Sequence, residues 1–353
     1  MTALTLIRPD MAGIPAYIIN DEIPDCPLQA NELPWSPPGM DMNRYPGKQS
    51  TRQLQTLLAE TYQVDTDNML ITRGSDDGID VIMRLFLQAR LDSVLQCPPT
   101  FSMYAFYARL QQAQIINCPL QENENGFYLD PASLDACWQP NCKLIMLCRP
   151  NNPTGELLSL STVADLCVRY ANRSIIVVDE AYIEFSDAPG ASILLRDFDN
   201  LIVLRTLSKA WGLAGLRIGA VLAQPAIIAA LQNVLAPFAL SDTVLDLGIQ
   251  ALQNKAWFAD SQQRIRQLRG RLARQLQVSP WIDKVYSASQ ANFLLVKSTY
   301  ATALADWCRQ NGLAIRAFVD NPYIYEHLRI TVGNDAQIEQ LISALAAFPG
   351  EKK

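Results

Sequence analysis

The chain has 353 residues, of which 49% are hydrophobic, 18% are charged and a single one is histidine. The 29 lysines and arginines are outnumbered by 35 aspartates and glutamates, so the net charge of −6 leaves no basic excess for binding a nucleic acid backbone. Because His327 is the sole histidine, histidine-rich metal sites are excluded, and acid–base chemistry must come from Lys, Tyr, Asp, Glu or a cofactor.

The cysteines and the apolar stretches suggest the compartment of the protein. The eight cysteines form no C-x-x-C pair and several lie inside apolar runs, which predicts buried, reduced thiols. The N-terminal segment has too short an apolar patch for a signal peptide. Residues 218–241 lack charge, but they contain two prolines and fit a strand, a turn and a helix better than a membrane span. We therefore expect a soluble, cytoplasmic protein.

In chain order, the first part is an arm and the second a large α/β domain. Residues 1–48 are rich in proline and turn residues, which predicts an arm lying on the surface or on a partner. Short apolar runs then alternate with stretches of helical period, the pattern of βα units that feed a mostly parallel sheet. The predicted strands are 69–72, 93–97, 114–118, 143–148, 174–178, 201–204 and 217–222, and the predicted helices are 51–62, 76–89, 102–112, 160–170 and 226–235. They predict a three-layer α/β/α domain with a seven-stranded sheet over residues 49–236.

The last part, residues 237–353, has a different pattern and predicts a smaller α+β domain. A long polar helical stretch with repeated Gln and Arg comes first. The segments NFLLVK, LAIRAFV and HLRITV then predict strands, and residues 302–310 and 336–347 predict helices.

Lys209 is the strongest candidate for chemistry. It lies in TLSKAWGLAGLRIG, directly after a predicted strand, and small residues surround it. Such a lysine leaves room for a flat ligand and could form a Schiff base, or it could simply hold its amine in solvent at a strand end.

Three other segments follow predicted strands and could complete the same site. Asp179 comes after an apolar run, so it would point into the crevice at the strand ends. A buried carboxylate there needs a cation, such as a protonated pyridine nitrogen. Asp179 could instead cap a helix. Asn152 could direct its amide at a ring hydroxyl, or form a turn. Gly74, Ser75 and Asp76 open a helix whose free N–H groups suit a phosphate, although such helix starts are common.

Together these segments resemble the fold-type I pyridoxal-phosphate (PLP) enzymes and, more narrowly, the class II aminotransferases, whose lysine signature TLSKAWGLAG matches. With DEAYIEF, CPPTFSMY, RGSDDGID, NRYPG and HLRITVG, the chain is most similar to the histidinol-phosphate aminotransferase family, over residues 15–333. The resemblance implies transamination between L-histidinol phosphate and 2-oxoglutarate, giving imidazole acetol phosphate and glutamate in histidine biosynthesis. An aromatic amino-acid aminotransferase or a PLP-dependent decarboxylase on the same scaffold is the alternative.

The resemblance also implies roles at the cofactor. Lys209 would bind PLP covalently and move the substrate proton, and Asp179 would pair with the ring nitrogen. Asn152 and Tyr182 would hydrogen-bond the ring hydroxyl. The other cofactor residues implied are Ser75, Asp76, Thr206, Ser208 and Arg217, with Ser75, Asp76, Ser208 and Arg217 at the phosphate.

Two aromatic positions carry further implications of the resemblance. Phe101 occupies the place where the family has a tyrosine stacked on the ring, which keeps the stacking but loses a hydroxyl; Tyr104 is the nearby alternative, or both are core aromatics. Tyr45 would reach the phosphate of a neighbouring subunit, so a complete site would need a homodimer.

Substrate recognition would depend on arginines, because each expected substrate carries an anionic group. The resemblance places Arg329 at the substrate anion, with Arg316 as a second candidate and Tyr17 and Asn31 from the arm closing the pocket. His327 is expected to be structural or at the rim.

Arg149 departs from the family pattern, which has small polar residues at this position. It could assist an anionic substrate or pair with a nearby acid.

Overall fold

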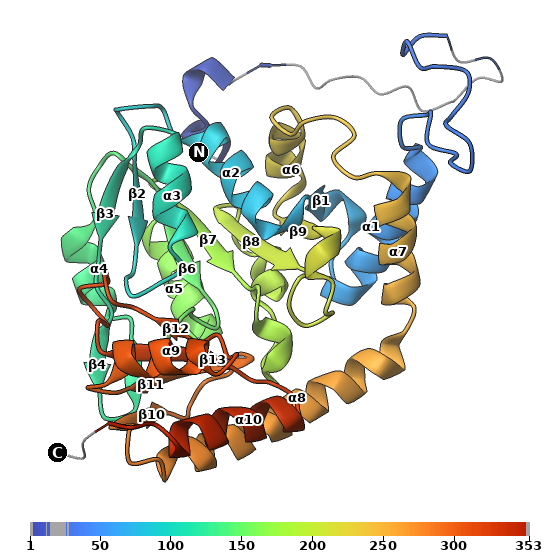
Figure 1. The fold of residues 1–353 in the computed structure, drawn as a ribbon. Coiled ribbons are helices and arrows are strands. Elements are labelled where there is room, and N and C mark those ends of the chain that lie inside the picture. The colour runs from blue at the N-terminus through green and yellow to red at the C-terminus, as the bar shows by residue number, and fades with distance from the viewer. Residues whose placement is uncertain (1–2, 12, 15–25, 27, 351–353) are drawn as a thin grey trace.

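The structure, a computed structural model, describes residues 3–11, 13–14, 26 and 28–350 (Figure 1). Its centre is a seven-stranded sheet in the order β1-β9-β8-β7-β6-β2-β3. Strand β9 runs antiparallel to its neighbours β1 and β8, and the other four pairs are parallel. The strands are β1 (Met69–Thr72), β2 (Ser93–Gln96), β3 (Gln114–Asn117), β6 (Cys142–Cys148), β7 (Ile175–Asp179), β8 (Leu201–Thr206) and β9 (Gly219–Leu222). The predicted mostly parallel seven-stranded sheet is confirmed.

Both faces of this sheet are covered by helices, because its central strands are apolar on both sides. In β7, Ile176 and Val178 face one core while Ile175 and Val177 face the other, and all four are fully buried. On the first face lie α1 (Lys48–Tyr62), α4 (Pro131–Cys137), α5 (Leu160–Arg169) and α7 (Asp242–Leu252). On the second face lie α2 (Gly74–Phe86), α3 (Met103–Leu110) and α6 (Pro225–Gln232). The three-layer α/β/α arrangement is therefore confirmed.

A second, four-stranded antiparallel sheet forms from the C-terminal part of the chain, in the order β10-β11-β13-β12. Its strands are β10 (Lys284–Tyr286), β11 (Phe293–Lys297), β12 (Arg316–Ala317) and β13 (His327–Thr331). The helices α8 (Lys255–Gln277), α9 (Ala301–Gln310) and α10 (Asp335–Ala346) cover one face over a separate apolar core, and α8 and α10 run side by side (Figure 1). The strand predicted at LAIRAFV is reduced to Arg316–Ala317.

Several elements were not predicted, each for a physical reason. The hairpin of β4 (Gln121–Asn123) and β5 (Gly126–Tyr128) begins with three exposed polar residues, so it has no apolar alternation. Helix α4 buries a single residue, Leu134. Helix α7 packs against α1 and the core of the large sheet, although it lies beyond residue 236. The boundaries at residues 48 and 236 stay predictions.

The remaining expectations concern the arm, the thiols and the membrane. In the arm, Ala3 and Leu6 are buried against the core rather than lying on the surface, whereas residues 28–47 lie near the start of α1 (Figure 1). All eight cysteines are unpaired, and six of them are buried. Residues 218–241 include β9 and α6, and the search of the described chain finds no helix that is both long and apolar enough to cross a membrane.

Candidate active site

A pocket lies at the carboxyl ends of the parallel strands. Cys148, Asp179 and Thr206 end the strands β6, β7 and β8, and the ladder register places Cys148 directly beside Asp179. Chain direction in a parallel sheet thus brings residues far apart in the sequence to one edge. The pocket is lined by Ser75, Asp76, Phe101, Cys148, Asp179, Ala181, Tyr182, Thr206, Ser208, Lys209 and Arg217. The structure therefore gathers every predicted cofactor residue here except Asn152, which lies alongside, and Tyr45.

Asp179 is the buried acid of the pocket, with 2% of its surface exposed. Its carboxylate accepts hydrogen bonds from the Tyr104 hydroxyl at 2.8 Å and the Ala181 N–H at 3.1 Å. Burial raises the pKa of Asp179 to about 6, although these two hydrogen bonds act in the opposite direction. Among the described residues no cationic side chain lies within ion-pair distance of it. A buried carboxylate without a cation fits a ligand that brings its own positive charge, such as a protonated pyridine nitrogen.

Lys209 supplies an amine with a lowered pKa. It follows β8 by three residues, and its Nζ lies 5.8 Å from the ring centre of Tyr182. Burial is the largest cause of the lowered pKa, and the positive charges of Arg329 and Arg217 add to it. A lysine in this setting loses its proton more readily and can act as a nucleophile or a base.

An anion site lies at the start of α2. Gly74 has a φ of +77°, and a Cβ there would lie 2.7 Å from Nη2 of Arg217, so the absent side chain makes room for the guanidinium. Nη1 of Arg217 donates to the Ser208 hydroxyl at 3.2 Å, and Nη2 lies 3.3 Å from the Asp76 carboxylate. With the N–H groups of Ser75 and Asp76 at the first turn of the helix, this arrangement fits a phosphate.

A chain of hydrogen bonds joins the second sheet to the pocket. The Asn152 amide donates to the Tyr182 hydroxyl at 3.2 Å and accepts from Nη1 of Arg329 at 2.6 Å. Arg316 lies directly opposite Arg329 in the β12–β13 ladder, with an exposed side chain. In the described part of the chain neither arginine has an acidic partner. Two like charges facing each other favour an anion between or beside them.

The arm residues are not brought to this pocket within one chain. Tyr45 is exposed, and its ring stacks on Phe238 with the ring centres 4.5 Å apart. Asn31 is exposed and makes no contact with the pocket in the described chain. Tyr17 lies outside the described residues. The roles expected for these three residues stay predictions.

Some residues of the site were missed or left open by the sequence. Tyr104 was weighed only as a stacking partner or a core aromatic, yet it is fully buried and donates to Asp179. It packs edge-on against Phe101 with the ring centres 5.6 Å apart. Cys148 was not predicted, although its position at the end of β6, next to the strand of Asp179, could have indicated it.

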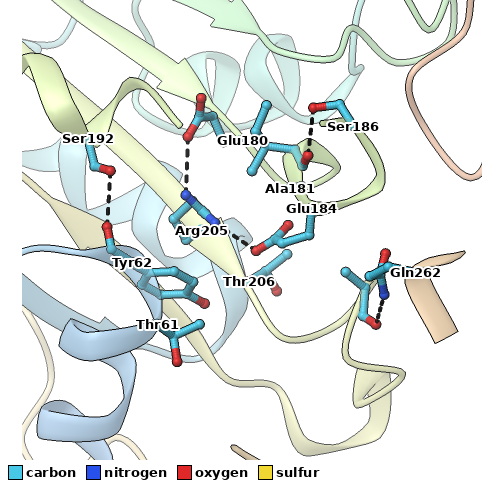
Figure 2. Close-up of polar contacts among 12 residues, drawn as sticks. Thr61, Tyr62, Glu180, Ala181, Glu184, Ser186, Ser192, Arg205, Thr206 and Gln262 are labelled. Atoms are coloured by element: carbon cyan, nitrogen blue, oxygen red, sulfur yellow. Dashed lines mark hydrogen bonds and ion pairs between the residues drawn. The ribbon is translucent and has the colours of Figure 1, made fainter. Parts of the chain in front are cut away.

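Arg149 pairs with an acid, which decides between its two possible roles. It is 1% exposed and lies 2.6 Å from Glu180, whose other oxygen lies 3.3 Å from Arg205. Figure 2 shows Arg205 between Glu180 and Glu184. The Arg205 guanidinium lies 2.9 Å from the Glu184 carboxylate and 4.4 Å from the ring centre of Tyr62. This buried network joins the ends of β6, β7 and β8 behind the pocket.

Comparisons with known proteins give similarity over nearly the whole chain. The family described as aminotransferase class I and II matches residues 23–345. Histidinol-phosphate aminotransferase 1 of Legionella pneumophila (strain Lens) is 46% identical over 99% of this chain and 96% of its own. Histidinol-phosphate aminotransferase of Xylella fastidiosa (strain Temecula1) is 37% identical over 98% and 96%. The solved Sinorhizobium meliloti histidinol-phosphate aminotransferase in complex with pyridoxal-5'-phosphate has a TM-score of 0.76 at 26% identity, covering 86% of this chain and 82% of that one.

Replacing Tyr104 with Phe tests the hydrogen bond to Asp179. Because that bond lowers the pKa of Asp179, its loss should raise the pKa above about 6. As the pH is lowered, Asp179 should then become protonated earlier, and PLP affinity should fall at a higher pH than in the wild type. Titrating the apoprotein with PLP between pH 5 and 8 measures this shift. The neighbouring carboxylates of Asp76 and Glu180 are unchanged in the variant.

The matched control is Tyr170→Phe, which removes another buried hydroxyl that donates to a carboxylate, that of Asp135, away from the pocket. It should leave the pH dependence of PLP binding unchanged. Identical pH curves for Tyr104→Phe and the wild type would contradict the role assigned to this bond.

Replacing Arg149 with Met tests the buried network. The change leaves the Glu180 carboxylate with one cation in place of two, and it should lower the free energy of unfolding by about 3 kcal/mol. Arg309→Met, which breaks an exposed ion pair with Asp306, should cost under about 1 kcal/mol. Denaturant unfolding of both variants measures the difference. Equal losses in the free energy of unfolding would show that the buried Arg149–Glu180 pair stabilises the fold no more than an exposed pair does.

Proposed function

The chain belongs to the class I and II aminotransferases, which are PLP-dependent enzymes, and we propose that it transfers the amino group of L-histidinol phosphate to 2-oxoglutarate. The products are imidazole acetol phosphate and glutamate, so the enzyme serves histidine biosynthesis. The proposal is supported by relatives of this name that are 46% and 37% identical over nearly the full chain. The alternatives, an aromatic amino-acid aminotransferase or a decarboxylase on this scaffold, are not better supported, because the full-length relatives reported above carry the histidinol-phosphate name.

The residues of the pocket fit PLP, and we assign each a part. When bound, PLP supplies an electron-withdrawing ring that takes up the negative charge left when the substrate Cα loses its proton. Lys209 would hold the cofactor covalently through its amine, and whenever that amine is free it would take up or return the Cα proton, as its lowered pKa allows. Asp179 keeps its charge by pairing with the protonated ring nitrogen. Asn152 and Tyr182 hydrogen-bond the ring hydroxyl.

The other contacts hold the cofactor in place. Arg217, Ser208 and the first N–H groups of α2 bind its phosphate, because they form the anion site described above. Phe101 lies against the ring, and its pocket-lining position beside Tyr104 supports this placement. Tyr104 in turn holds the Asp179 carboxylate in one orientation.

One observation carries the substrate proposal: Arg316 and Arg329, which have no acidic partner among the described residues, face each other beside the lysine pocket. Arg329 lies close enough to Lys209 to lower its pKa, and Arg316 is its cross-strand neighbour. The phosphate of histidinol phosphate and the carboxylates of 2-oxoglutarate each need such a cation, and a guanidinium can bind either. Tyr17 and Asn31 would close the pocket from the arm.

We also propose a cytoplasmic homodimer. Tyr45 lies outside the pocket of its own chain, and its exposed ring leaves it available to the phosphate site of a second copy. Beside it, Gln232, residues 235–240 and the start of α1 help to line a cleft of about 440 Å³, larger than the lysine pocket. An arm contributed by each subunit would make the dimer necessary for a complete site.

Kinetics with competing substrates test the proposed function. With 2-oxoglutarate as acceptor, we expect kcat/KM for histidinol phosphate to exceed that for phenylalanine. Arg329→Ala should lower kcat/KM for histidinol phosphate about 100-fold, through the loss of the proposed charge-assisted bond to the substrate anion. The exposed Arg309→Ala is the control and should match the wild type. Preference for phenylalanine, or release of carbon dioxide in place of glutamate, would overturn the proposal.

A further inference from the structure

The β4–β5 hairpin reaches from the large sheet to the second sheet. The hairpin follows β3 in the chain. Its Phe127 packs in one apolar cluster with Tyr286 of β10, Leu295 of β11 and Ile324. The Phe127 and Tyr286 rings lie 5.4 Å apart between centres. The hairpin is therefore a direct connection between the part of the chain that holds Lys209 and the strands that hold the substrate arginines.

A row of hydrogen bonds runs through this contact. The Tyr286 hydroxyl donates to Oε1 of Glu122 at 2.6 Å and lies 3.0 Å from Nε2 of His327. Lys284 Nζ donates to the same Glu122 oxygen at 3.0 Å. Burial raises the pKa of Glu122, but the bonds from Tyr286 and Lys284 outweigh it and the net shift is downward, so the carboxylate is charged. Tyr286 must then donate to Glu122 and accept from His327.

This direction of donation sets the state of the histidine. His327 carries its proton on Nε2, and its Nδ1 has no hydrogen-bond partner among the described residues. Burial lowers the pKa of His327 to about 4, although the charges of Glu122 and Glu326 and the backbone of Ile324 oppose the shift and Lys297 adds to it. His327 is thus a neutral donor at ordinary pH.

His327 and Arg329 lie two residues apart on β13, so their side chains leave the same face of the strand. On that face His327 meets Tyr286, while Nη1 of Arg329 donates to Asn152 at 2.6 Å. The alternate residue Leu328 points into the other core of the second sheet. Any slide or tilt of β13 relative to the hairpin would therefore move the guanidinium away from Asn152 and the lysine pocket.

We propose that Glu122, Tyr286 and His327 form a clamp that positions Arg329 for the anionic group of the substrate. This inference rests on the proposed function, and it deepens it by assigning the sole histidine a part in substrate affinity. None of the three touches the substrate in this account, so they are positioning residues. Their loss should weaken binding of the anionic substrates while leaving the cofactor contacts intact.

Two clamp variants, with a rescue and a control, test the inference. Tyr286→Phe removes the central hydroxyl, and His327→Leu removes the donor; each should raise KM for both histidinol phosphate and 2-oxoglutarate about tenfold and keep kcat within about twofold. His327→Gln places an amide N–H near the position of Nε2, and it should return KM to within about threefold of the wild type. The absorbance of the bound cofactor should be the same in all of them.

The matched control is Tyr128→Phe, because Tyr128 lies on the same hairpin and its exposed hydroxyl donates only locally, to Gln121 at 2.7 Å. It should behave as the wild type. If thermal unfolding shows that the buried variants do not fold, Glu122→Ala replaces them: that side chain is 43% exposed, and its loss removes the acceptor of the Tyr286 hydroxyl, so KM should rise in the same way.

Two failures can be told apart. A wild-type enzyme that does not turn over histidinol phosphate overturns the proposed function, and the clamp is then measured through KM for 2-oxoglutarate with the amino donor that the enzyme accepts. If the wild-type enzyme turns over histidinol phosphate but the clamp variants keep the wild-type KM, the clamp is overturned. A fall in kcat at constant KM in those variants overturns it too. Failure of His327→Gln to restore KM would also count against it.

Discussion

The structure depends on one buried carboxylate that the protein itself does not neutralise. Asp179 ends the central strand β7, is 2% exposed, and receives hydrogen bonds from Tyr104 and Ala181 but no cation from the described residues. Burying a charge in this way is costly unless a ligand completes the pair. The cofactor of this enzyme family meets that need, because its ring nitrogen can carry a proton. Lys209 and Arg217 then lie where the rest of the same ligand would be held.

Unlike Asp179, the charged residues that follow or end the same strands neutralise one another. Glu180, the next residue after Asp179, lies between Arg149 and Arg205. Arg205 also pairs with Glu184, as Figure 2 shows. This network is internally balanced and ties three strand ends together. It fixes the strand ends on which the pocket is built. Asp179, whose charge has no cationic partner among the described residues, and Lys209, whose pKa is lowered, both lie at this edge.

The sequence predicted the central sheet well because its strands are apolar runs between turn residues. It also predicted which residues line the pocket, because they directly follow those strands. It could not predict partners that depend on packing. Tyr104 and Asp179 are 75 positions apart, and Arg149 and Glu180 are 31 apart, so no local pattern joins them. The hairpin starts with an exposed polar strand and gave no apolar signal. The role proposed for Tyr45 would need a second chain, so the structure of one subunit does not test it.

The central claim is that Asp179 is charged because it faces a protonated ring nitrogen. The most direct test is the ¹⁵N chemical shift of PLP labelled at that nitrogen, measured in the wild type and in Asp179→Asn. The account predicts a protonated nitrogen in the wild type at pH 7 and above, and an unprotonated one in the variant. The same shift in both proteins would contradict it, because Asp179 would then not be the group that holds the proton.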